Sequence, residues 1–250
     1  MIDLVYLARN RREFTEESFS MLLENTDWSL VQDFHVYDDG SVDGTVEYLE
    51  GALHEARDLL PDYSLKRTEF GSPISILNDF VENTQSLLIA KIDNDTVVPP
   101  RWLNSCVEVM SDSQELQCLG IEAFYEVDCD PFAARGFEHC AFTGGIGVFR
   151  RAPFKNSMPQ ARGIYFGLGI WQQAEGLLCG WIRPSLPVFL LDRLPFDYYR
   201  ALSERYIEQG WQRPWTPYNS LISQDLWAWC HPTLIRGEQD ARADGNDGQD

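Results

Sequence analysis

The chain has 250 residues and a formal net charge of −19, from 39 acidic and 20 basic side chains. Hydrophobic residues make up 44% of it and aromatic residues 13%, a composition typical of a folded protein and not of a disordered one. So strong a negative charge repels phosphate backbones and anionic membranes, which disfavours bulk binding of nucleic acid.

The first 95 residues alternate between strand-like and helix-like patterns. Short apolar runs predict strands at residues 2–8, 34–37, 63–68 and 87–92. Apolar side chains at helical spacing predict helices at residues 13–25, 45–60 and 73–81. This alternation favours an α/β fold with a mostly parallel sheet between helices, in which ligands bind at the carboxyl ends of the strands.

The second half has a less regular pattern. It predicts strands at residues 115–124, 142–149 and 187–191, helices at 170–179 and 196–209, and a polar loop at 128–139. Glycines within 142–149 indicate close approach of a ligand to the backbone, or a bulge. Residues 237–250 are acidic and poor in apolar side chains, so we expect a disordered tail after a single domain at 1–236.

Six cysteines occur without the spacing of a zinc site, and a chain of this length does not need disulfides. Free thiols in a reducing cytoplasm are therefore expected. The first residues enter a strand pattern without the features of a signal peptide. No apolar run reaches the roughly 18 residues of a membrane span.

The most informative stretch is the apolar strand that ends at Asp93-Asn94-Asp95. In extended backbone the two carboxylates share a face, where they repel each other unless a cation lies between them. Mg²⁺ or Mn²⁺ prefers such oxygen ligands and keeps positions open for substrate phosphates. The alternative is a simple turn, since Asp and Asn are common turn residues.

Four patterns in order resemble the inverting glycosyltransferases of the GT-A fold, in the family-two group, over roughly residues 2–192. They are V-Y-D-D-G-S-V-D-G-T at 36–45, Gly71 followed by Asn78, D-N-D at 93–95, and G-G-I-G-V-F-R-R at 144–151. The resemblance implies transfer of a sugar from a nucleotide-diphosphate donor, UDP- or dTDP-linked, to a hydroxyl acceptor. Residues 1–112 would then form the nucleotide-sugar half and 113–236 the acceptor half.

On the donor side, Asp38 or Asp39 would accept the imide N–H of uracil or thymine, a donor that adenine and cytosine lack. The Asp39-Gly40 pair also suits a tight turn. Arg9 would meet a phosphate or ribose, or stay solvated. The resemblance further implies donor contacts at Asp93, Asn94 and Asn78, and a metal held by Asp93, Asp95 and His231, although a structural role suits that histidine as well.

On the acceptor side, the family's E-D pair falls on Leu168-Gly169, which cannot act as a base. The base would then be Glu175, or an upstream carboxylate such as Asp128, Asp130 or Glu138. The acceptor would be contacted by Gly144, Gly145, Arg151, Trp171 and Gln172. For Trp171 the alternative is a place in the core.

Residues 131–163 are positively charged within an acidic chain, which favours a compact anionic acceptor. An acidic glycan, a lipid-linked sugar or a modified nucleobase in DNA would suit this charge. Alternatively, Arg150 and Arg151 pair with carboxylates or hold the donor diphosphate.

Two other classes of protein compete with this interpretation. A nucleotidyltransferase of sugar phosphates has a similar acidic site, but it needs a glycine-rich phosphate loop, and residues 7–12 contain no glycine. A non-catalytic carbohydrate-binding protein could retain the fold without the base.

Overall fold

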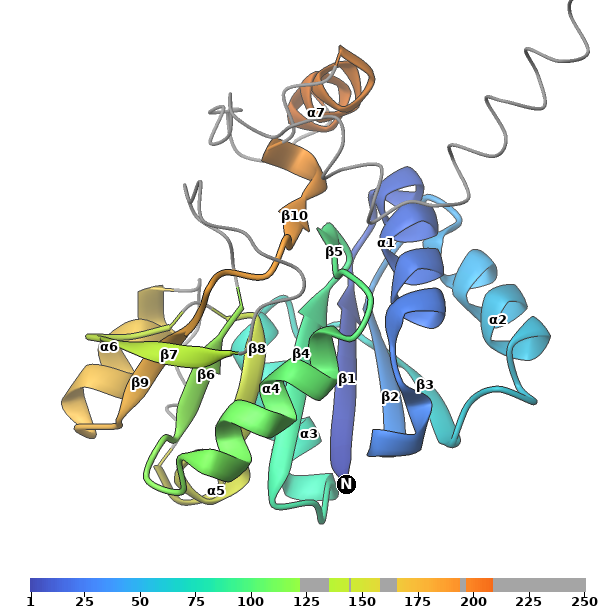
Figure 1. Cartoon of the computed structure of the whole chain (residues 1–250). Helices are drawn as coiled ribbons and strands as arrows, with labels where there is room; N and C mark the ends of the chain where they lie inside the picture. Colours follow the sequence, from blue (N-terminus) through green and yellow to red (C-terminus); the bar gives the residue numbers. More distant parts are fainter. Residues whose placement is uncertain (122–134, 144, 158–165, 194–196, 209–250) are drawn as a thin grey trace, which may run out of the picture.

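The computed structural model describes residues 1–121, 135–143, 145–157, 166–193 and 197–208. Its centre is an eight-stranded sheet in the order β3-β2-β1-β4-β8-β6-β9-β7 (Figure 1). The strands are β1 Ile2–Ala8, β2 Val31–Asp39, β3 Asp62–Thr68, β4 Leu88–Asp93, β6 Cys118–Gly120, β7 Gly136–Cys140, β8 Gly147–Arg150 and β9 Cys179–Arg183. A separate ribbon pairs β5, Thr96–Val97, with β10, Phe189–Leu190.

Strand direction divides the sheet into two parts. The first four strands, β1 to β4, are parallel, whereas β8 runs antiparallel to β4 and to β6. We call the edge formed by Ala8, Asp39, Thr68 and Asp93 the upper edge, and the edge formed by Ile2, Val31, Asp62 and Leu88 the lower edge. The carboxyl ends of β1 to β4 therefore meet at the upper edge, while β8 ends at the lower edge.

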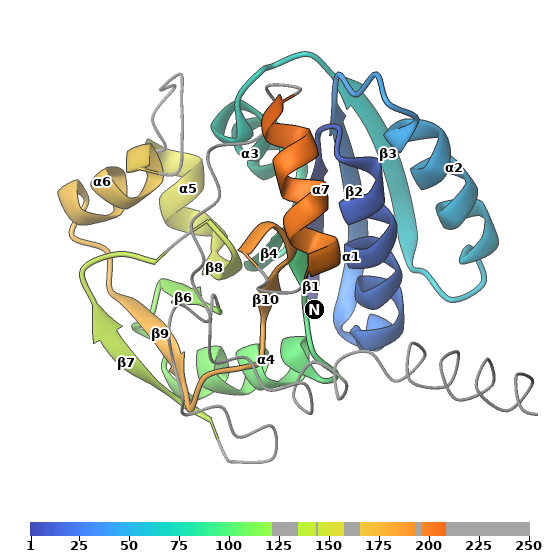
Figure 2. The ribbon, with the colours of Figure 1, turned by 90° about the horizontal axis from the view of Figure 1, so that it is seen from above.

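Helices cover both faces of the sheet (Figure 2). One face is covered by α1 Arg12–Asn25, α2 Thr45–Glu55 and α4 Trp102–Asp112, and the other by α3 Pro73–Asn83, α5 Arg151–Ser157 and α6 Phe166–Ala174. Because β1 is covered on both sides, all seven of its residues are buried. Pro73 begins α3 at a position where its missing N–H costs no hydrogen bond.

The last described helix, α7 Asp197–Glu208, lies above the upper edge (Figures 1 and 2). It packs on α1 through a small core that includes Phe14, Tyr199 and Tyr206. The hydroxyl of Tyr199 donates to Glu17, and that of Tyr206 donates to Glu13. Two short 3-10 turns complete the described structure, η1 Trp28–Leu30 and η2 Leu191–Arg193.

The predicted α/β fold with its mostly parallel sheet is confirmed, but the second half differs from the prediction in detail. Helix α6 ends at Ala174, and β9 begins at Cys179, inside the predicted helix. Strand β7, Gly136–Cys140, overlaps the predicted polar loop at 128–139. Its side chains are exposed or half-buried and do not alternate between apolar and polar along the strand, so no strand signal marks this segment of the sequence. A Cβ on Gly147 would lie 2.1 Å from the Leu119 carbonyl oxygen, so this glycine admits a neighbouring strand.

Among the described helices, none is long and apolar enough to cross a membrane. The predicted acidic tail, 237–250, lies outside the described residues.

Candidate functional site

The loop after β4 is fixed to the upper edge through its backbone. Asp93 ends β4, and Asn94 and Asp95 form the turn into β5. The Asn94 N–H donates to the Leu7 carbonyl at 2.9 Å, and the Leu191 N–H donates to the Asp95 carbonyl at 2.7 Å. We call residues 93–95 the acidic loop. It is therefore held between β1 and the ribbon of β5 and β10.

Asp93 faces a lysine of the same strand. Because Lys91 and Asp93 are two residues apart, their side chains project from the same face of β4. Lys91 Nζ lies 2.5 Å from Asp93 Oδ1, and the two side chains are only 3% and 9% exposed. Burial raises the pKa of Asp93, while Lys91 opposes that rise by favouring the carboxylate. The second oxygen, Oδ2, is buried and has no hydrogen-bond partner in the described part of the chain.

Asp95 faces an arginine from the turn between β1 and α1. Arg11 Nη1 donates to Asp95 Oδ2 at 2.9 Å, and Arg11 Nη2 donates to Asn94 Oδ1 at 2.8 Å. The guanidinium also lies 5.8 Å from the centre of the Phe14 ring. Burial alone would lower the pKa of Arg11, but the nearby carboxylates of Asp95 and Asp192 outweigh burial and raise it.

The turn that presents Arg11 has an unusual backbone. Asn10 and Arg11 both adopt the left-handed conformation, with φ of 52° and 59°. The Asn10 N–H donates to Ser41 Oγ at 2.7 Å, and the Asn10 carbonyl accepts from Asn94 Nδ2 at 2.8 Å. The ends of β1, β2 and β4 thus hold one another, and they aim the Arg11 side chain at the acidic loop.

The two aspartates at the end of β2 have different surroundings. Asp38 is fully buried, and its Oδ2 accepts from the Ser41 N–H at 3.0 Å, which makes it a turn residue. Asp39 Oδ1 accepts from Thr68 Oγ1 at 3.2 Å and from the Gly71 N–H at 3.1 Å. Asp39 Oδ2 lies 3.7 Å from Nη1 of the half-exposed Arg9. Asp39 is therefore better placed than Asp38 to contact a ligand.

Asn94 and Asn78 are the other residues predicted to contact the donor. The Asn94 side chain is buried, and its polar atoms are all hydrogen-bonded: it donates to Asn10 and Thr15 and accepts from Arg11. It therefore serves to orient the loop. Asn78 is half-buried in the second turn of α3, the helix that follows Gly71.

Asp192 is a site residue that sequence reasoning missed. It lies in η2, directly after the ribbon in which Leu190 pairs with Thr96 and Leu191 bonds the Asp95 carbonyl. This antiparallel register places Asp192 beside the acidic loop, and its carboxylate acts electrostatically on Arg11. No local motif marks Asp192, because its position depends on a pairing between strands about a hundred residues apart.

On the predicted acceptor side, Trp171 and Gln172 have structural contacts. Trp171 is buried against Phe154, with ring centres 4.9 Å apart, so the alternative of a core tryptophan holds. Gln172 is fully buried, and it accepts from the Thr143 N–H at 2.9 Å while its Nε2 pairs with Thr143 Oγ1 at 3.1 Å. Through Thr143 it fixes the loop that contains the buried Gly145.

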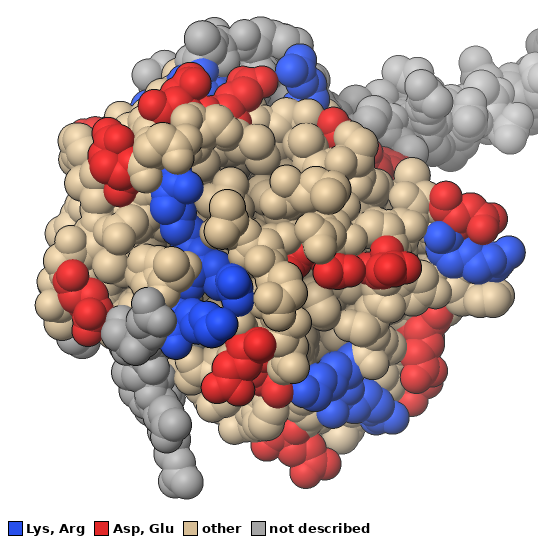
Figure 3. Space-filling model, turned by 90° about the horizontal axis from the view of Figure 1, so that it is seen from below, with Lys and Arg blue, Asp and Glu red and all other residues tan. Residues whose placement is uncertain are grey.

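Arg151 does not lie at the upper edge. Because β8 runs antiparallel to β4, Arg150 pairs with Leu88 at the lower edge, and the Arg151 N–H bonds the Leu87 carbonyl. Arg151 Nη1 donates to the Thr84 carbonyl at 2.7 Å, and Arg150 bonds three carbonyl groups near the end of α4. Viewed from below, Lys and Arg side chains lie among Asp and Glu side chains (Figure 3). These two arginines therefore support the lower edge and do not contact an acceptor at the upper edge.

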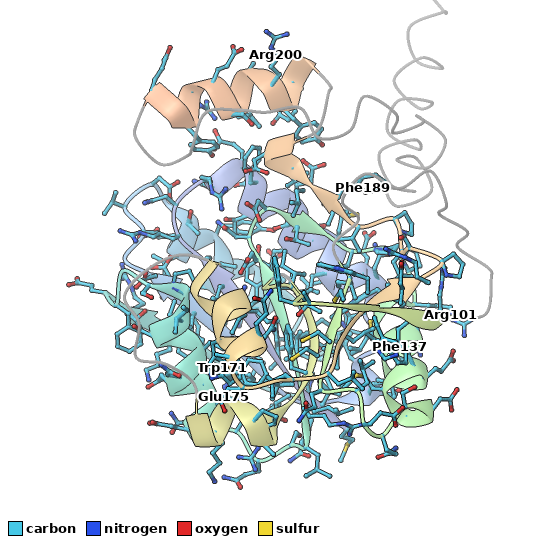
Figure 4. All side chains as sticks on the ribbon, turned by 90° about the vertical axis from the view of Figure 1, so that its left-hand side faces the viewer. Arg101, Phe137, Trp171, Glu175, Phe189 and Arg200 are labelled. Atoms are coloured by element: carbon cyan, nitrogen blue, oxygen red, sulfur yellow. The ribbon has the colours of Figure 1, made fainter. Side chains whose placement is uncertain are left out.

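Glu175 also lies far from the acidic loop. It is exposed just after the end of α6, in the turn that leads to the start of β9. Figure 4 shows Glu175 in the lower half of the molecule and Phe189, which belongs to the ribbon beside the acidic loop, in the upper half. The placement does not support Glu175 as the base. Glu138, on β7, pairs with Arg183 at 3.0 Å.

Four predicted residues lie outside the described part of the chain: Asp128, Asp130, Gly144 and His231.

The oxygen ligands at the upper edge suit a hard divalent cation. Asp93 Oδ2 is a buried acceptor without a described partner, and Asp95 is a second carboxylate two residues away. Both carboxylates already face a cation of the protein, and the described residues contain no cluster of three or more His, Cys, Asp or Glu that could hold a metal. Asp93 and Asp95 would hold a metal only if Arg11 left Asp95, because Mg²⁺ and Mn²⁺ prefer carboxylate oxygens of this kind.

Solved structures with the same arrangement of strands and helices identify the fold. A mannosyltransferase from Pyrobaculum calidifontis, PcManGT in complex with GDP-Man and Mn²⁺, matches with a TM-score of 0.57 and 14% identity, over 99% of this chain and 76% of that chain. S. aureus TarS 1-349 in complex with UDP-GlcNAc matches with a TM-score of 0.56 and 13% identity, over 74% of this chain and 56% of that chain. GalNAc-T7 with UDP, GalNAc and Mn²⁺ matches with a TM-score of 0.56 and 12% identity, over 73% of this chain and 42% of that chain. These matches show the GT-A fold.

The sequence defines the family. The profile of glycosyl transferase family 2 matches residues 4–154, which is more than half of the chain, so the chain belongs to this family. No curated protein sequence matches it. The chain spans less than two thirds of the TarS and GalNAc-T7 chains. The predicted resemblance to family two is confirmed.

Proposed function

We propose that the protein transfers a sugar from a nucleotide-diphosphate donor to a hydroxyl acceptor, with the donor lying across the upper edge from Asp39 to Asp95. One observation carries the proposal: two carboxylates and two arginines converge there from the ends of β1, β2 and β4. Arg11 contacts Asp95 at 2.9 Å, and Arg9 lies 3.7 Å from Asp39. The two arginines suit the diphosphate of the donor, and the two carboxylates suit its nucleobase and a metal.

Asp39 is the residue that we assign to the nucleobase. Its Oδ1 is held by Thr68 and Gly71, which fixes the carboxylate, while Oδ2 faces the exposed Arg9. A carboxylate accepts the imide N–H of uracil or thymine, whereas adenine and cytosine lack this donor, so the assignment supports a UDP- or dTDP-linked sugar over adenine or cytosine nucleotides. Asp38 supports the turn through Ser41.

A divalent cation, Mn²⁺ or Mg²⁺, would be held by Asp95 with Asp93 beside it, and His231 stays a predicted ligand. When bound, such an ion neutralises the charge of the departing nucleotide diphosphate. The residues of the chain bind and orient the donor around it: Asn94 and Asn10 fix the loop, and Arg11 supplies a second positive charge.

The acceptor would lie beside the loop that Gln172 fixes through Thr143. A hydroxyl of a glycan, of a lipid-linked sugar or of a modified nucleobase in DNA suits this class of enzyme. Arg150 and Arg151 make their contacts at the lower edge, so these two side chains do not support an anionic acceptor at the upper edge. An anionic acceptor stays a prediction. A cytoplasmic location stays a prediction.

The test is a thermal-shift screen of UDP-, dTDP- and GDP-linked sugars with and without Mn²⁺, followed by an assay for sugar release from the donor that stabilises the protein. A ligand that binds only the folded state raises its melting temperature by mass action. We expect a shift with the uridine or thymidine donors in the presence of Mn²⁺.

Asp39→Asn should weaken UDP binding by about 1–3 kcal/mol, the scale of a hydrogen bond to a charged group. Asp62→Asn is the matched control, because Asp62 is an exposed aspartate at the lower edge. Equal stabilisation of the parent protein by GDP- and UDP-linked sugars would contradict the assignment of Asp39.

A further inference from the structure

The two carboxylates of the acidic loop are neutralised in different ways. The Lys91–Asp93 pair is sealed in the core, with side chains 3% and 9% exposed. The Arg11–Asp95 pair lies nearer the surface, with side chains 15% and 16% exposed. Separating the first pair would leave two charges in the core, whereas the second pair can separate at the upper edge, where water and a ligand reach it.

The loop has several hydrogen bonds besides those from Arg11. Asn94 Nδ2 donates to the Asn10 carbonyl and to Thr15 Oγ1, both at 2.8 Å. Ser18 Oγ donates to the Asn94 carbonyl at 3.0 Å, and Leu191 bonds the carbonyl of Asp95. These bonds remain when the guanidinium moves, so Asp95 keeps its position and gains a free oxygen.

A metal ion and Arg11 cannot both occupy this oxygen. Arg11 Nη1 lies 2.9 Å from Asp95 Oδ2, the atom that a divalent cation would also need. Two cations at that distance from one carboxylate oxygen would repel each other strongly in a partly buried site. The three carboxylates around Arg11, those of Asp93, Asp95 and Asp192, attract either cation.

We propose that Arg11 is an exchangeable counter-ion of Asp95: a divalent cation displaces it, and the released guanidinium contacts the diphosphate of the donor. The proposal rests on the proposed function, since it assigns a positioning role to a residue of the same site. Lys91 keeps Asp93 neutralised throughout, so the exchange takes place at Asp95. Arg11 therefore opposes the binding of metal alone and favours the binding of metal together with nucleotide.

The test measures Mn²⁺ binding to the full chain by electron paramagnetic resonance of free Mn²⁺, first without nucleotide. Arg11→Gln should tighten Mn²⁺ binding by about tenfold, because the competing hydrogen-bonded charge is gone. With UDP present, the same variant should bind the nucleotide with Mn²⁺ about tenfold more weakly. Effects of opposite sign on the two ligands are the signature of exchange, since a merely structural role of Arg11 would weaken both.

Arg12→Gln is the matched control. Arg12 follows Arg11 and is the first residue of α1, but its side chain pairs with Glu16 and makes no described contact with the acidic loop. The Arg12→Gln substitution removes the same charge from a neighbouring position. We therefore expect less than about a twofold change in the affinity for Mn²⁺ or for UDP with Mn²⁺, from the loss of long-range charge alone. Arg11→Lys keeps the charge and loses the forked geometry, so its effects should fall between those of Arg11→Gln and the parent.

Melting curves of all variants establish that they fold, and Asp95→Asn should abolish Mn²⁺ binding in the parent and in the Arg11→Gln background. Unchanged or weaker Mn²⁺ binding by Arg11→Gln would overturn the proposal, as would tighter binding of both ligands. So would an absence of Mn²⁺ binding by every variant. Sugar release by the parent protein is measured separately, so a failure of the exchange is distinguished from a failure of the transferase function.

Discussion

The two halves of the sheet differ in where strand direction sends their polar side chains. In the first half, β1, β2 and β4 are parallel, so the residues that follow them meet at the upper edge. In the second half, β8 runs the opposite way, so Arg150 and Arg151 reach the lower edge. Glu175, after α6, shortly precedes Leu178, whose carbonyl accepts from Gln117 beside Arg150 at that end. A motif therefore reports a site only together with the direction of its strand.

The largest expected effect separates the two edges directly. Asp95→Ala should lower kcat/KM by a hundredfold or more, because it removes the carboxylate to which we assign the metal and the charged donor. Glu175→Ala should change kcat/KM by less than about twofold, since Glu175 is exposed and far from the loop. Steady-state kinetics with the identified donor checks both. A large loss in Glu175→Ala would show that the second half reaches the reacting atoms after all.

The next effect concerns the lysine within the upper edge. Lys91→Met should lower the free energy of unfolding, measured by urea denaturation, by about 3–5 kcal/mol. The substitution leaves the buried Asp93 charge without its partner. The matched control is Lys66→Met on β3, whose pair with Asp79 is more exposed and is worth about 1 kcal/mol or less. The double variant Lys91→Met, Asp93→Leu should recover much of the loss. Equal effects of the two lysine substitutions would mean that burial does not distinguish these pairs.

A third effect follows from the contact of α7 with α1. Burial raises the pKa of Glu17 to about 7, while the hydrogen bond from Tyr199 opposes the rise. The folded state therefore holds this proton more tightly than the unfolded state does. Stability should fall as pH rises from about 4.5 to about 7, by about 1–3 kcal/mol, and stay level above that range.

Glu17→Gln should remove this pH dependence and raise the melting temperature at pH 8, because the amide oxygen can still accept from Tyr199. Glu24→Gln, at an exposed position of the same helix, should leave the slope unchanged. A parallel fall in stability with pH in the parent and in Glu17→Gln would assign the slope to other groups.

The smallest effect concerns the lower edge. Arg151→Gln should cost about 1 kcal/mol of stability, through loss of its hydrogen bond to the Thr84 carbonyl. It should leave the KM of donor and acceptor unchanged. A raised acceptor KM that depends on salt would restore the anionic acceptor predicted from the charge of residues 131–163.

The sequence by itself determined the part of the protein in which spacing along the chain sets geometry. Alternating apolar patterns predicted the first four strands, and each acidic motif follows a strand end, so parallel pairing brings Asp39 and Asp93 to one edge. The periodicity also placed α7, which runs from Asp197 to Glu208 as the pattern predicts.

Only the tertiary structure decided which side chains meet at that edge. Local patterns singled out Arg9, whereas the left-handed turn at Asn10 directs Arg11 to Asp95, and the pairing of β10 with β5 brings in Asp192. The structure also showed that Asp38 is a buried turn residue, that Gln172 fixes a loop, and that Arg151 and Glu175 lie at the other end of the sheet. The physical reason is that strand direction, register and backbone conformation depend on contacts between distant segments, which the residue types in one segment do not fix.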